Sequence, residues 1–255
     1  MQRLQALSGQ FEIRADWVMK LRQLESFDVC ILLDDSGSMS TVSVGGGGAR
    51  PPNPYAPLPT RWTELQTTLS VLLPLATALN PSVDVYFLNR PPLLNVSDPS
   101  QVAVAFQSPP SGVTPLSKAF RYIMAAKQAV LAEKKLLVLI FTDGQPTDDH
   151  GRTDIRTFLN DLASKPPNVY VQMVACTDDE QAVEWMNEAD ERIPHVDTSD
   201  DFLSERQEIL RAQGPRFPFS FGDFIVKCLL APIDPSFDGL DVKGGRQNKK
   251  GCTIA

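Results

Sequence analysis

Two aspartates and three hydroxyl residues occupy positions from which their side-chain oxygens could hold a hard cation. Asp34, Ser36 and Ser38 alternate in the segment DDSGSM, directly after the apolar run VCILL. Thr114 stands before a proline in SGVTPL, and Asp143 follows a second apolar run in LIFTDG. Oxygen ligands without histidine or thiolate suit Mg²⁺, or else Mn²⁺ or Ca²⁺, better than Zn²⁺. These five residues are therefore the candidate metal ligands.

The local sequence indicates how such a site would be shaped. The alternation in D-x-S-x-S lets three side chains of one loop converge on a point, and Gly37 allows the loop to turn tightly. Mg²⁺ prefers six oxygens and keeps several waters, which leaves a position for a carboxylate from outside the chain. We expect Asp35, Gly37 and Gly144 at the rim of the site, where Asp35 would either tighten metal binding or repel an acidic partner.

Short apolar runs, each followed by polar residues, predict the strands that would position these ligands. Such runs, apolar on both faces, are typical of buried parallel strands. Since helical patterns separate them, we expect an α/β fold with a doubly wound, mostly parallel, Rossmann-like sheet and helices on both faces. Ligands of such sheets bind at the carboxyl ends of the strands. The predicted strands are Val29–Leu33, Val83–Leu88, Leu136–Phe141, Val169–Ala175 and a weaker edge strand, Ile193–Val196.

The helical patterns and the remaining segments define the expected organisation. Thr114 would cap a helix that has Pro115 as its first residue. We expect an N-terminal helical extension in residues 1–26, one domain in 27–232 and a flexible basic tail in 233–255. A Gly- and Pro-rich surface loop is expected within the domain, in residues 43–59. The other predicted helices are Arg61–Leu79, a short one ending at Phe106, Asp154–Ala163, Asp178–Ala189 and Phe219–Leu230.

Three motifs resemble one protein family. ILLDDSGSM (31–39), SGVTPL (111–116) and LIFTDGQPTDD (139–149) are similar, in the same order, to the metal-ion-dependent adhesion site of the von Willebrand factor A (VWA) domain. The resemblance covers roughly residues 26–232. Residues 190–213 resemble intracellular members of this superfamily from microbial eukaryotes. The run Thr147, Asp148 and Asp149 makes the rim of the site more acidic than expected for the family.

The resemblance implies that some candidate ligands contact the metal directly and others through water. In the VWA family the two serines and the threonine contact the metal directly, which would apply here to Ser36, Ser38 and Thr114. The two aspartates act mostly through water, which would apply to Asp34 and Asp143. The family implies no catalysis, because an Asp or Glu of a protein partner completes the coordination of the metal. The chain is thus expected to be a non-enzymatic interaction module.

Bulk composition excludes several other classes of protein. The net charge of −7 disfavours a general nucleic-acid binder, which needs a basic face. The four cysteines form no C-x-x-C pair, and the first residues lack the apolar core of a secretory signal, which together indicate a cytoplasmic protein. The sequence has no stretch of 18 apolar residues, so it predicts no membrane-spanning helix.

The last residues predict a lipid anchor. Cys252 opens the sequence CTIA, a C-a-a-X box of the type associated with farnesylation. Stable membrane attachment takes a lipid and a second signal such as a polybasic patch. That second signal is present in Lys243, Arg246, Lys249 and Lys250. Prenylation would place the domain on a cytosolic membrane face; the alternative is an unmodified basic tail.

Two other functions remain open from the residues. A phosphohydrolase-like enzyme could use the same metal. Its haloacid dehalogenase type is disfavoured, because it has an Asp after its first strand but needs a second acid two residues later, where this chain has Ser36. A scaffold with a vestigial metal site would bind partners through its acidic surface. A serine hydrolase is disfavoured because no G-x-S-x-G surrounds Ser36 or Ser38.

Overall fold

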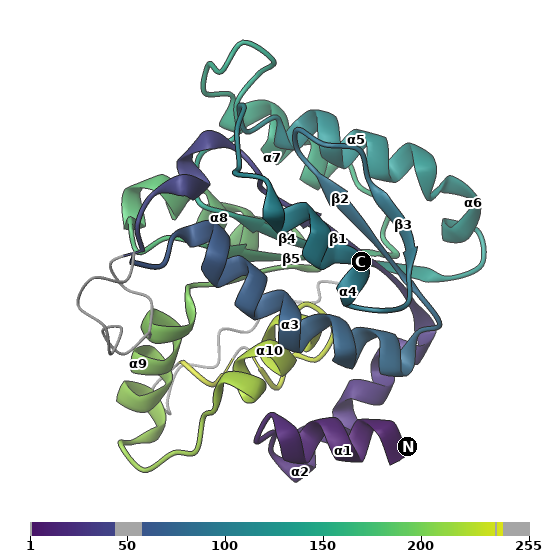
Figure 1. Ribbon diagram of the computed structural model, residues 1–255, viewed down its shortest axis with the longest axis vertical. Helices are drawn as coiled ribbons and strands as arrows, with labels where there is room; N and C mark the ends of the chain where they lie inside the picture. The colour runs from purple at the N-terminus through teal and green to yellow at the C-terminus, as the bar shows by residue number, and fades with distance from the viewer. Residues whose placement is uncertain (1, 44–57, 238, 242–255) are drawn as a thin grey trace, which may run out of the picture.

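A computed structural model describes residues 2–43, 58–237 and 239–241. These residues form a six-stranded sheet in the order β3-β2-β1-β4-β5-β6, in which β3 alone runs antiparallel to its neighbour. Helices cover both faces (Figure 1), so the predicted α/β, Rossmann-like fold class is confirmed. The strands are β1 (Phe27–Leu33), β2 (Val83–Phe87), β3 (Leu93–Val96), β4 (Lys135–Thr142), β5 (Val169–Ala175) and β6 (Val196–Ser199).

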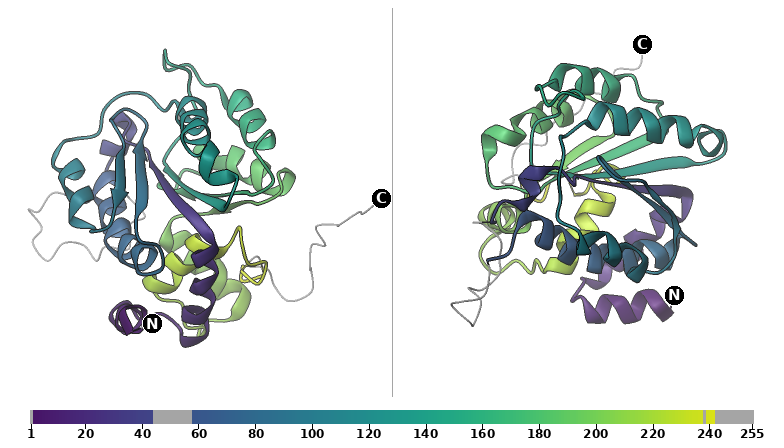
Figure 2. Two further views of the ribbon diagram at one scale, coloured as in Figure 1. Left: turned by 90° about the vertical axis from the view of Figure 1, so that its right-hand side faces the viewer. Right: turned by 45° about the horizontal axis from the view of Figure 1, so that its top comes forward.

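The helices lie in two layers, one on each side of the sheet (Figures 1 and 2). On one side are α1 (Gln2–Gln10), α2 (Ala15–Lys20), α3 (Arg61–Leu79), α9 (Phe202–Gln213) and α10 (Phe221–Leu230). On the other are α5 (Leu116–Ala126), α7 (Ile155–Ala163) and α8 (Glu180–Arg192). Shorter elements are η1 (Leu21–Ser26), η2 (Gly37–Ser40), α4 (Ser100–Ala103), η3 (Val104–Gln107) and α6 (Gln128–Leu131). In the described part of the chain, none of these helices has the length and apolarity needed to cross a membrane.

Strand β1 shows why the central strands are apolar throughout. Successive side chains of a strand point to opposite faces. Val29, Ile31 and Leu33 accordingly join the core under α3 and α10, whereas Cys30 and Leu32 join the core under α5 and α7. All five are fully buried. A strand covered by helices on both faces must be hydrophobic at every position, which is why this run could be recognised in the sequence.

The chain reverses its direction of winding between β1 and β4. It moves from β1 to β2 on one side and from β4 to β5 on the other, while β1 and β4 themselves pair in parallel from Phe27 to Leu33. This is the topological switch point, where the crevice at the carboxyl ends of the strands receives ligands in open α/β sheets. Asp34 and Asp143 directly follow these two strands.

Several elements differ from the sequence-based expectations. Helix α5 begins at Leu116 rather than Pro115, and the side chain of Thr114 does not cap it, because Pro115 has a non-helical ψ of 62°. The edge strand β6 is shifted to Val196–Ser199. Helix α8 is likewise displaced toward its C-terminus, since Asp179 caps it by accepting hydrogen bonds from the backbone N–H groups of Gln181 and Ala182.

Strand β3 and helix α9 were missed by the sequence reading. β3 has four residues, two of them exposed, and is defined only by its pairing with β2. α9 does carry a local signal, because the carboxylate of Asp201 accepts hydrogen bonds from the N–H groups of Leu203 and Ser204. This N-cap pattern would have predicted the start of the helix.

The N-terminal helices and residues 233–237 pack on the same core as α3 and α10, so the predicted flexible tail does not begin at residue 233. The Trp17 ring lies edge-on to two phenylalanine rings, and its centroid is 6.2 Å from that of Phe219 and 4.8 Å from that of Phe237. Asp223 at the start of α10 accepts a hydrogen bond from the backbone N–H of Arg14 at 2.9 Å. Gly222 permits this approach, because a Cβ there would lie 2.1 Å from the carbonyl oxygen of Phe11. The predicted N-terminal extension is thus packed closely against the last helix.

A buried ion pair connects α9 to α10. Lys227 Nζ of α10 lies 2.6 Å from Glu205 Oε1 of α9, and each side chain is 4 % exposed. Burial alone would lower the pKa of Lys227, but attraction to Glu205 outweighs it and raises the pKa. Glu205 contributes most to keeping the lysine charged inside the protein, and the charges of Asp197 and Asp241 add to its effect.

We expect Glu205→Gln to lower the free energy of unfolding by about 3–5 kcal/mol, because it leaves the Lys227 ammonium buried without its counter-charge. Urea denaturation measures this difference. The exposed pair Lys118–Asp149 provides the control, since Asp149→Asn should cost less than about 1 kcal/mol. The double variant Glu205→Leu/Lys227→Met should recover most of the loss; equal costs for Glu205→Gln and Asp149→Asn would refute the role of the pair.

Candidate metal centre

Asp34 is fixed at the end of β1 by contacts from β4 and from the loop that follows β1. Its backbone N–H donates to the carbonyl oxygen of Phe141 at 2.9 Å, which continues the pairing of β1 with β4. Its Oδ1 accepts from the backbone N–H of Ser36 at 2.8 Å, and its Oδ2 accepts from the Thr142 hydroxyl at 2.5 Å. The residue is fully buried. Asp34 is therefore held in one orientation beneath the loop that follows it.

Two serine hydroxyls connect Asp34 to Asp143. The hydroxyl oxygens of Ser36 and Ser38 lie 3.0 Å apart, and that of Ser38 donates to Asp143 Oδ1 at 2.7 Å. Asp143 is 2 % exposed, Ser36 is also 2 % exposed, and Ser38 is exposed. The fold thus gathers four of the five predicted ligands, from two segments more than 100 residues apart in the chain, into one continuous group of oxygens.

Thr114 lies in the adjacent loop. Its backbone N–H donates to the Thr147 hydroxyl at 3.0 Å, and its carbonyl oxygen accepts from the Thr147 N–H at 2.9 Å. The backbone N–H of Gly37 donates to the carbonyl oxygen of Gly112 at 3.1 Å, which joins this loop to the serine loop. Among the described residues, no hydrogen bond links the Thr114 side chain to the other four ligands. Its role at the metal stays a prediction from the resemblance.

The electrostatics of the group favour a cation. Burial raises the pKa of Asp34 to about 6, and the negative charge of Asp143 contributes to the same shift. A divalent cation near both carboxylates would offset this cost. The described residues contain no cluster of three or more His, Cys, Asp or Glu side chains able to hold a metal. The two carboxylates and the serine hydroxyls together fit a hard cation that keeps part of its water.

Arg61 is a member of the site that the sequence reading missed. This first residue of α3 donates from Nη1 to Asp143 Oδ2 at 2.8 Å and from Nη2 to the Thr177 hydroxyl at 2.6 Å. The arginine occupies one oxygen of Asp143 and leaves the other to Ser38. Nothing local in the sequence marks Arg61, because only the packing of α3 brings it to the end of β4.

Asp35 is not at the rim, where it was predicted. It is fully buried, and its Oδ1 accepts from the backbone N–H and the side-chain amide of Asn89 at 2.8 and 3.2 Å. Its Oδ2 lies 3.0 Å from Arg90 Nε. Asp34 already faces the site, and alternation at the end of the strand turns the next side chain away. Asp35 therefore stabilises the neighbouring β2 loop instead of meeting a ligand.

The rest of the predicted rim is less acidic than its sequence indicates. The carboxylate of Asp148 accepts hydrogen bonds from the N–H groups of His150 and Arg152 at 2.8 and 2.9 Å. Asp149 pairs with Lys118 at 2.8 Å. Gly37 is exposed and Gly144 half-buried. Part of the negative charge beside the site is thus already compensated within the chain.

Comparison with known proteins yields structural likeness but no match in sequence. Neither a family model nor a curated protein matches the sequence. A solved structure of the manganese-loaded TRAP protein of Plasmodium vivax is similar over 69 % of this chain and 69 % of that chain, with 17 % sequence identity and a TM-score of 0.41. At these values the likeness carries no argument about the function of this chain, which rests on its own residues.

Gly112 makes possible the contact between the serine loop and the loop that contains Thr114. Its φ is +106°, and a Cβ there would lie 2.4 Å from Asn89 Oδ1, the side chain that holds Asp35. We expect Gly112→Ala to lower the free energy of unfolding by about 1–3 kcal/mol, measured by chemical denaturation. Gly144→Ala is the matched control, since no atom lies within 4 Å of its added Cβ. Equal stability of the two variants would contradict this account.

Proposed function

We propose that this chain is a VWA-type interaction module that binds a divalent cation, Mg²⁺ or else Mn²⁺ or Ca²⁺, and presents it to an Asp or Glu of a protein partner. The observation that carries the proposal is the continuous link from Asp34 through Ser36 and Ser38 to Asp143 at the switch point of the sheet. The sequence motifs supply Thr114 as the fifth ligand. When bound, the cation would supply a coordination position for the partner's carboxylate.

The candidate ligands would have different roles in metal and partner binding, and their exposure indicates from which side a partner approaches. Ser36 and Ser38 would contact the metal directly, whereas Asp34 and Asp143 would act through water. Asp34 is buried beneath the loop and Ser38 is exposed at its surface. A partner would therefore approach from the side of Ser38, and Asp34 would supply charge from below without meeting the partner.

The hydrogen bonds of Asp34 support binding over phosphoryl chemistry. A phosphohydrolase of the alternative type needs an Asp oxygen free to attack phosphorus and an acid two residues later. Here both oxygens of Asp34 accept hydrogen bonds from within the protein, and the later position is Ser36. Assignment as a non-enzyme remains part of the proposal, and turnover of a phosphate ester that disappears in Asp34→Asn would overturn it.

Metal binding is tested by calorimetric titration of Mg²⁺ and Mn²⁺. We expect Asp34→Ala/Ser36→Ala to weaken binding at least about tenfold, because it removes one carboxylate and one hydroxyl from the site. The control Asp16→Ala/Ser164→Ala removes the same two side-chain types from exposed positions far from the site in sequence. Identical heats for the wild-type protein and Asp34→Ala/Ser36→Ala would refute the metal site.

Arg61 provides a second test of the same site. Charges of +2 and +1 separated by about 6 Å in water repel by about 1.4 kcal/mol. We therefore expect Arg61→Gln to strengthen divalent-cation binding by up to about tenfold in the same titration. Arg121→Gln, which removes an arginine paired with Asp161 on the opposite face, should leave binding unchanged. Weaker binding in Arg61→Gln would show that orienting Asp143 outweighs the repulsion.

We further propose that the module acts in the cytoplasm, on a membrane surface reached through a prenylated Cys252. Cys252 and the basic residues before it lie outside the described residues, so this proposal is supported by the sequence alone. Expression in a eukaryotic cell, followed by mass spectrometry of the C-terminal peptide, should show the added mass of an isoprenoid. Cys252→Ser should abolish it and release the protein from membranes; an unmodified wild-type peptide would contradict the proposal.

A further inference from the structure

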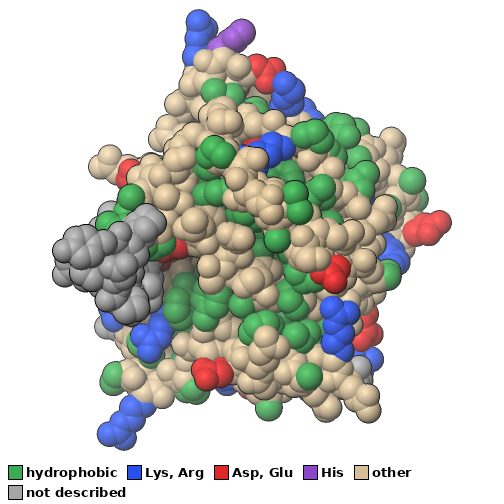
Figure 3. All heavy atoms as spheres, in the orientation of Figure 1, with side chains coloured by type: hydrophobic (Ala, Val, Ile, Leu, Met, Phe, Trp, Pro, Cys, Tyr) green, Lys and Arg blue, Asp and Glu red, His purple; other side chains and the backbone are tan. Residues whose placement is uncertain are grey.

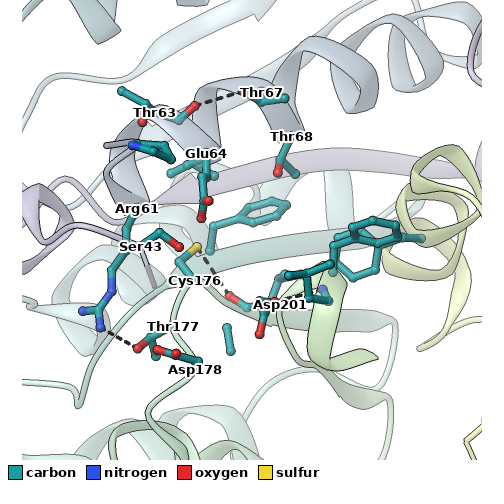
Figure 4. Close-up of a pocket in the computed structure, with 18 of the residues that line it drawn as sticks. Ser43, Arg61, Thr63, Glu64, Thr67, Thr68, Cys176, Thr177, Asp178 and Asp201 are labelled. Carbon is teal, nitrogen blue, oxygen red and sulfur yellow. Dashed lines mark hydrogen bonds between the residues drawn. The ribbon is translucent and has the colours of Figure 1, made fainter. Parts of the chain in front are cut away.

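A cavity of about 520 Å³ opens beside the candidate metal centre (Figure 4). It lies among the first turns of α3, the carboxyl ends of β4 and β5, and the N-terminal ends of α9 and α10. Its volume is in the range of pockets that bind ligands or side chains in proteins. The space-filling view shows hydrophobic side chains gathered on this face of the molecule (Figure 3).

The floor and one wall of the cavity are apolar. Phe141 and Val174 come from the ends of β4 and β5 and are almost fully buried. Phe202 of α9 packs against Phe221 and Phe224 of α10, with ring centroids 5.1 and 5.6 Å apart. A large apolar side chain entering here would remove hydrophobic surface from water on both partners. The aromatic faces would also attract a nearby cation.

Carboxylates surround this apolar floor. Glu64, Asp178 and Asp201 all line the cavity. In Figure 4 the carboxylate of Glu64 points from α3 into the cavity. Burial raises the pKa of Glu64, although a hydrogen bond from Ser43 opposes the shift, and the charges of Asp201 and Asp178 raise it further. A cation placed among these three groups would relieve their mutual repulsion.

The arginine of the cavity does not supply that cation. The Arg61 guanidinium is directed out of the cavity and is bound to Asp143 and Thr177. Figure 4 shows the Arg61 side chain extending toward Thr177 and away from Glu64. The charge of Arg61 opposes the rise in the pKa of Glu64 only as the smallest of its causes, and the three carboxylates of the lining outnumber this one positive charge.

The same arginine forms the boundary between the cavity and the metal centre. Arg61 and Thr177 line the cavity, and Arg61 contacts Asp143 directly. One guanidinium group thus separates the two sites. An extended peptide advances about 3.5 Å per residue, so two residues of a partner would span about 7 Å. A single partner segment could occupy both sites at once.

We propose that this cavity receives a large apolar side chain with an adjacent Lys or Arg, from the same partner segment whose acidic residue binds the metal. The apolar floor would take the hydrophobic side chain, and Glu64 with its two neighbouring acids would take the cation. The joint engagement of both sites rests on the proposed function. The apolar and cationic preference of the cavity stands on the cavity alone.

The preference of the cavity is tested without metal. In chelator, 4-phenylbutylamine should bind at least about fivefold more tightly than 4-phenylbutyrate, as measured by ligand-observed NMR titration. Glu64→Gln should reduce this ratio about fivefold, whereas Glu184→Gln on the exposed side of α8 should leave it unchanged. Thr68→Phe, at the cavity lining, should weaken binding of both compounds by filling space. Equal binding of amine and carboxylate, or a ratio unaffected by Glu64→Gln, would overturn the proposal.

The partner segment is tested by competition in Mg²⁺. The capped peptide Asp-Gly-Phe-Lys should displace 4-phenylbutylamine, and Asp-Gly-Phe-Glu should be at least about fivefold weaker. The lysine peptide should also weaken in Glu64→Gln and in Asp34→Ala/Ser36→Ala. Displacement that persists unchanged in Asp34→Ala/Ser36→Ala and in chelator would refute the metal-dependent function while supporting the cavity. Amine binding that neither peptide displaces would overturn the assignment to a partner segment and leave a site for a free amine.

Discussion

The parallel pairing of β1 with β4 is the constraint on which the candidate site depends. It places Leu33 beside Phe141, so the residues that follow the two strands emerge at the same edge of the sheet. The hydrogen bonds from Asp34 N–H to Phe141 and from the Thr142 hydroxyl to Asp34 continue that pairing into the loops. Two motifs more than 100 residues apart thereby share one set of oxygens. Because both strands are buried on both faces, their register is fixed by the whole core.

The cost of this arrangement is electrostatic. Asp34 and Asp143 are carboxylates that the fold removes from water and places near each other, and each buried charge requires compensation. Hydrogen bonds from Ser36, Thr142 and Ser38 supply part of it, and Arg61 supplies a positive charge at the outer oxygen of Asp143. A divalent cation would complete the compensation. The same arginine separates the candidate metal centre from the acid-lined cavity, so charge balance at one site affects the other.

The fold treats neighbouring acidic residues very differently. Asp34 lies beneath the serine loop, whereas Asp35 turns toward Asn89 and Arg90 and stabilises another loop. Asp148 accepts hydrogen bonds from backbone N–H groups of its own turn, whereas Glu64 points into the cavity, which has an apolar floor and an acidic lining. These side chains have similar chemistry in the sequence. Their surroundings decide whether each carboxylate is hydrogen-bonded to the backbone, paired with an arginine or directed into the cavity.

The sequence by itself determined the α/β class, the central strands and three candidate metal ligands, because continuous apolar runs and the alternation in D-x-S-x-S are local patterns. Thr114 and Asp143 became candidates only through the order and context of their motifs. Tertiary structure decided which of these side chains meet. It gathered Asp34, Ser36, Ser38 and Asp143, left Thr114 in the adjoining loop, and turned Asp35 away. It also brought in Arg61 and formed the cavity around Glu64. These outcomes depend on contacts between residues distant in the chain, and such contacts leave no periodic pattern in any one segment.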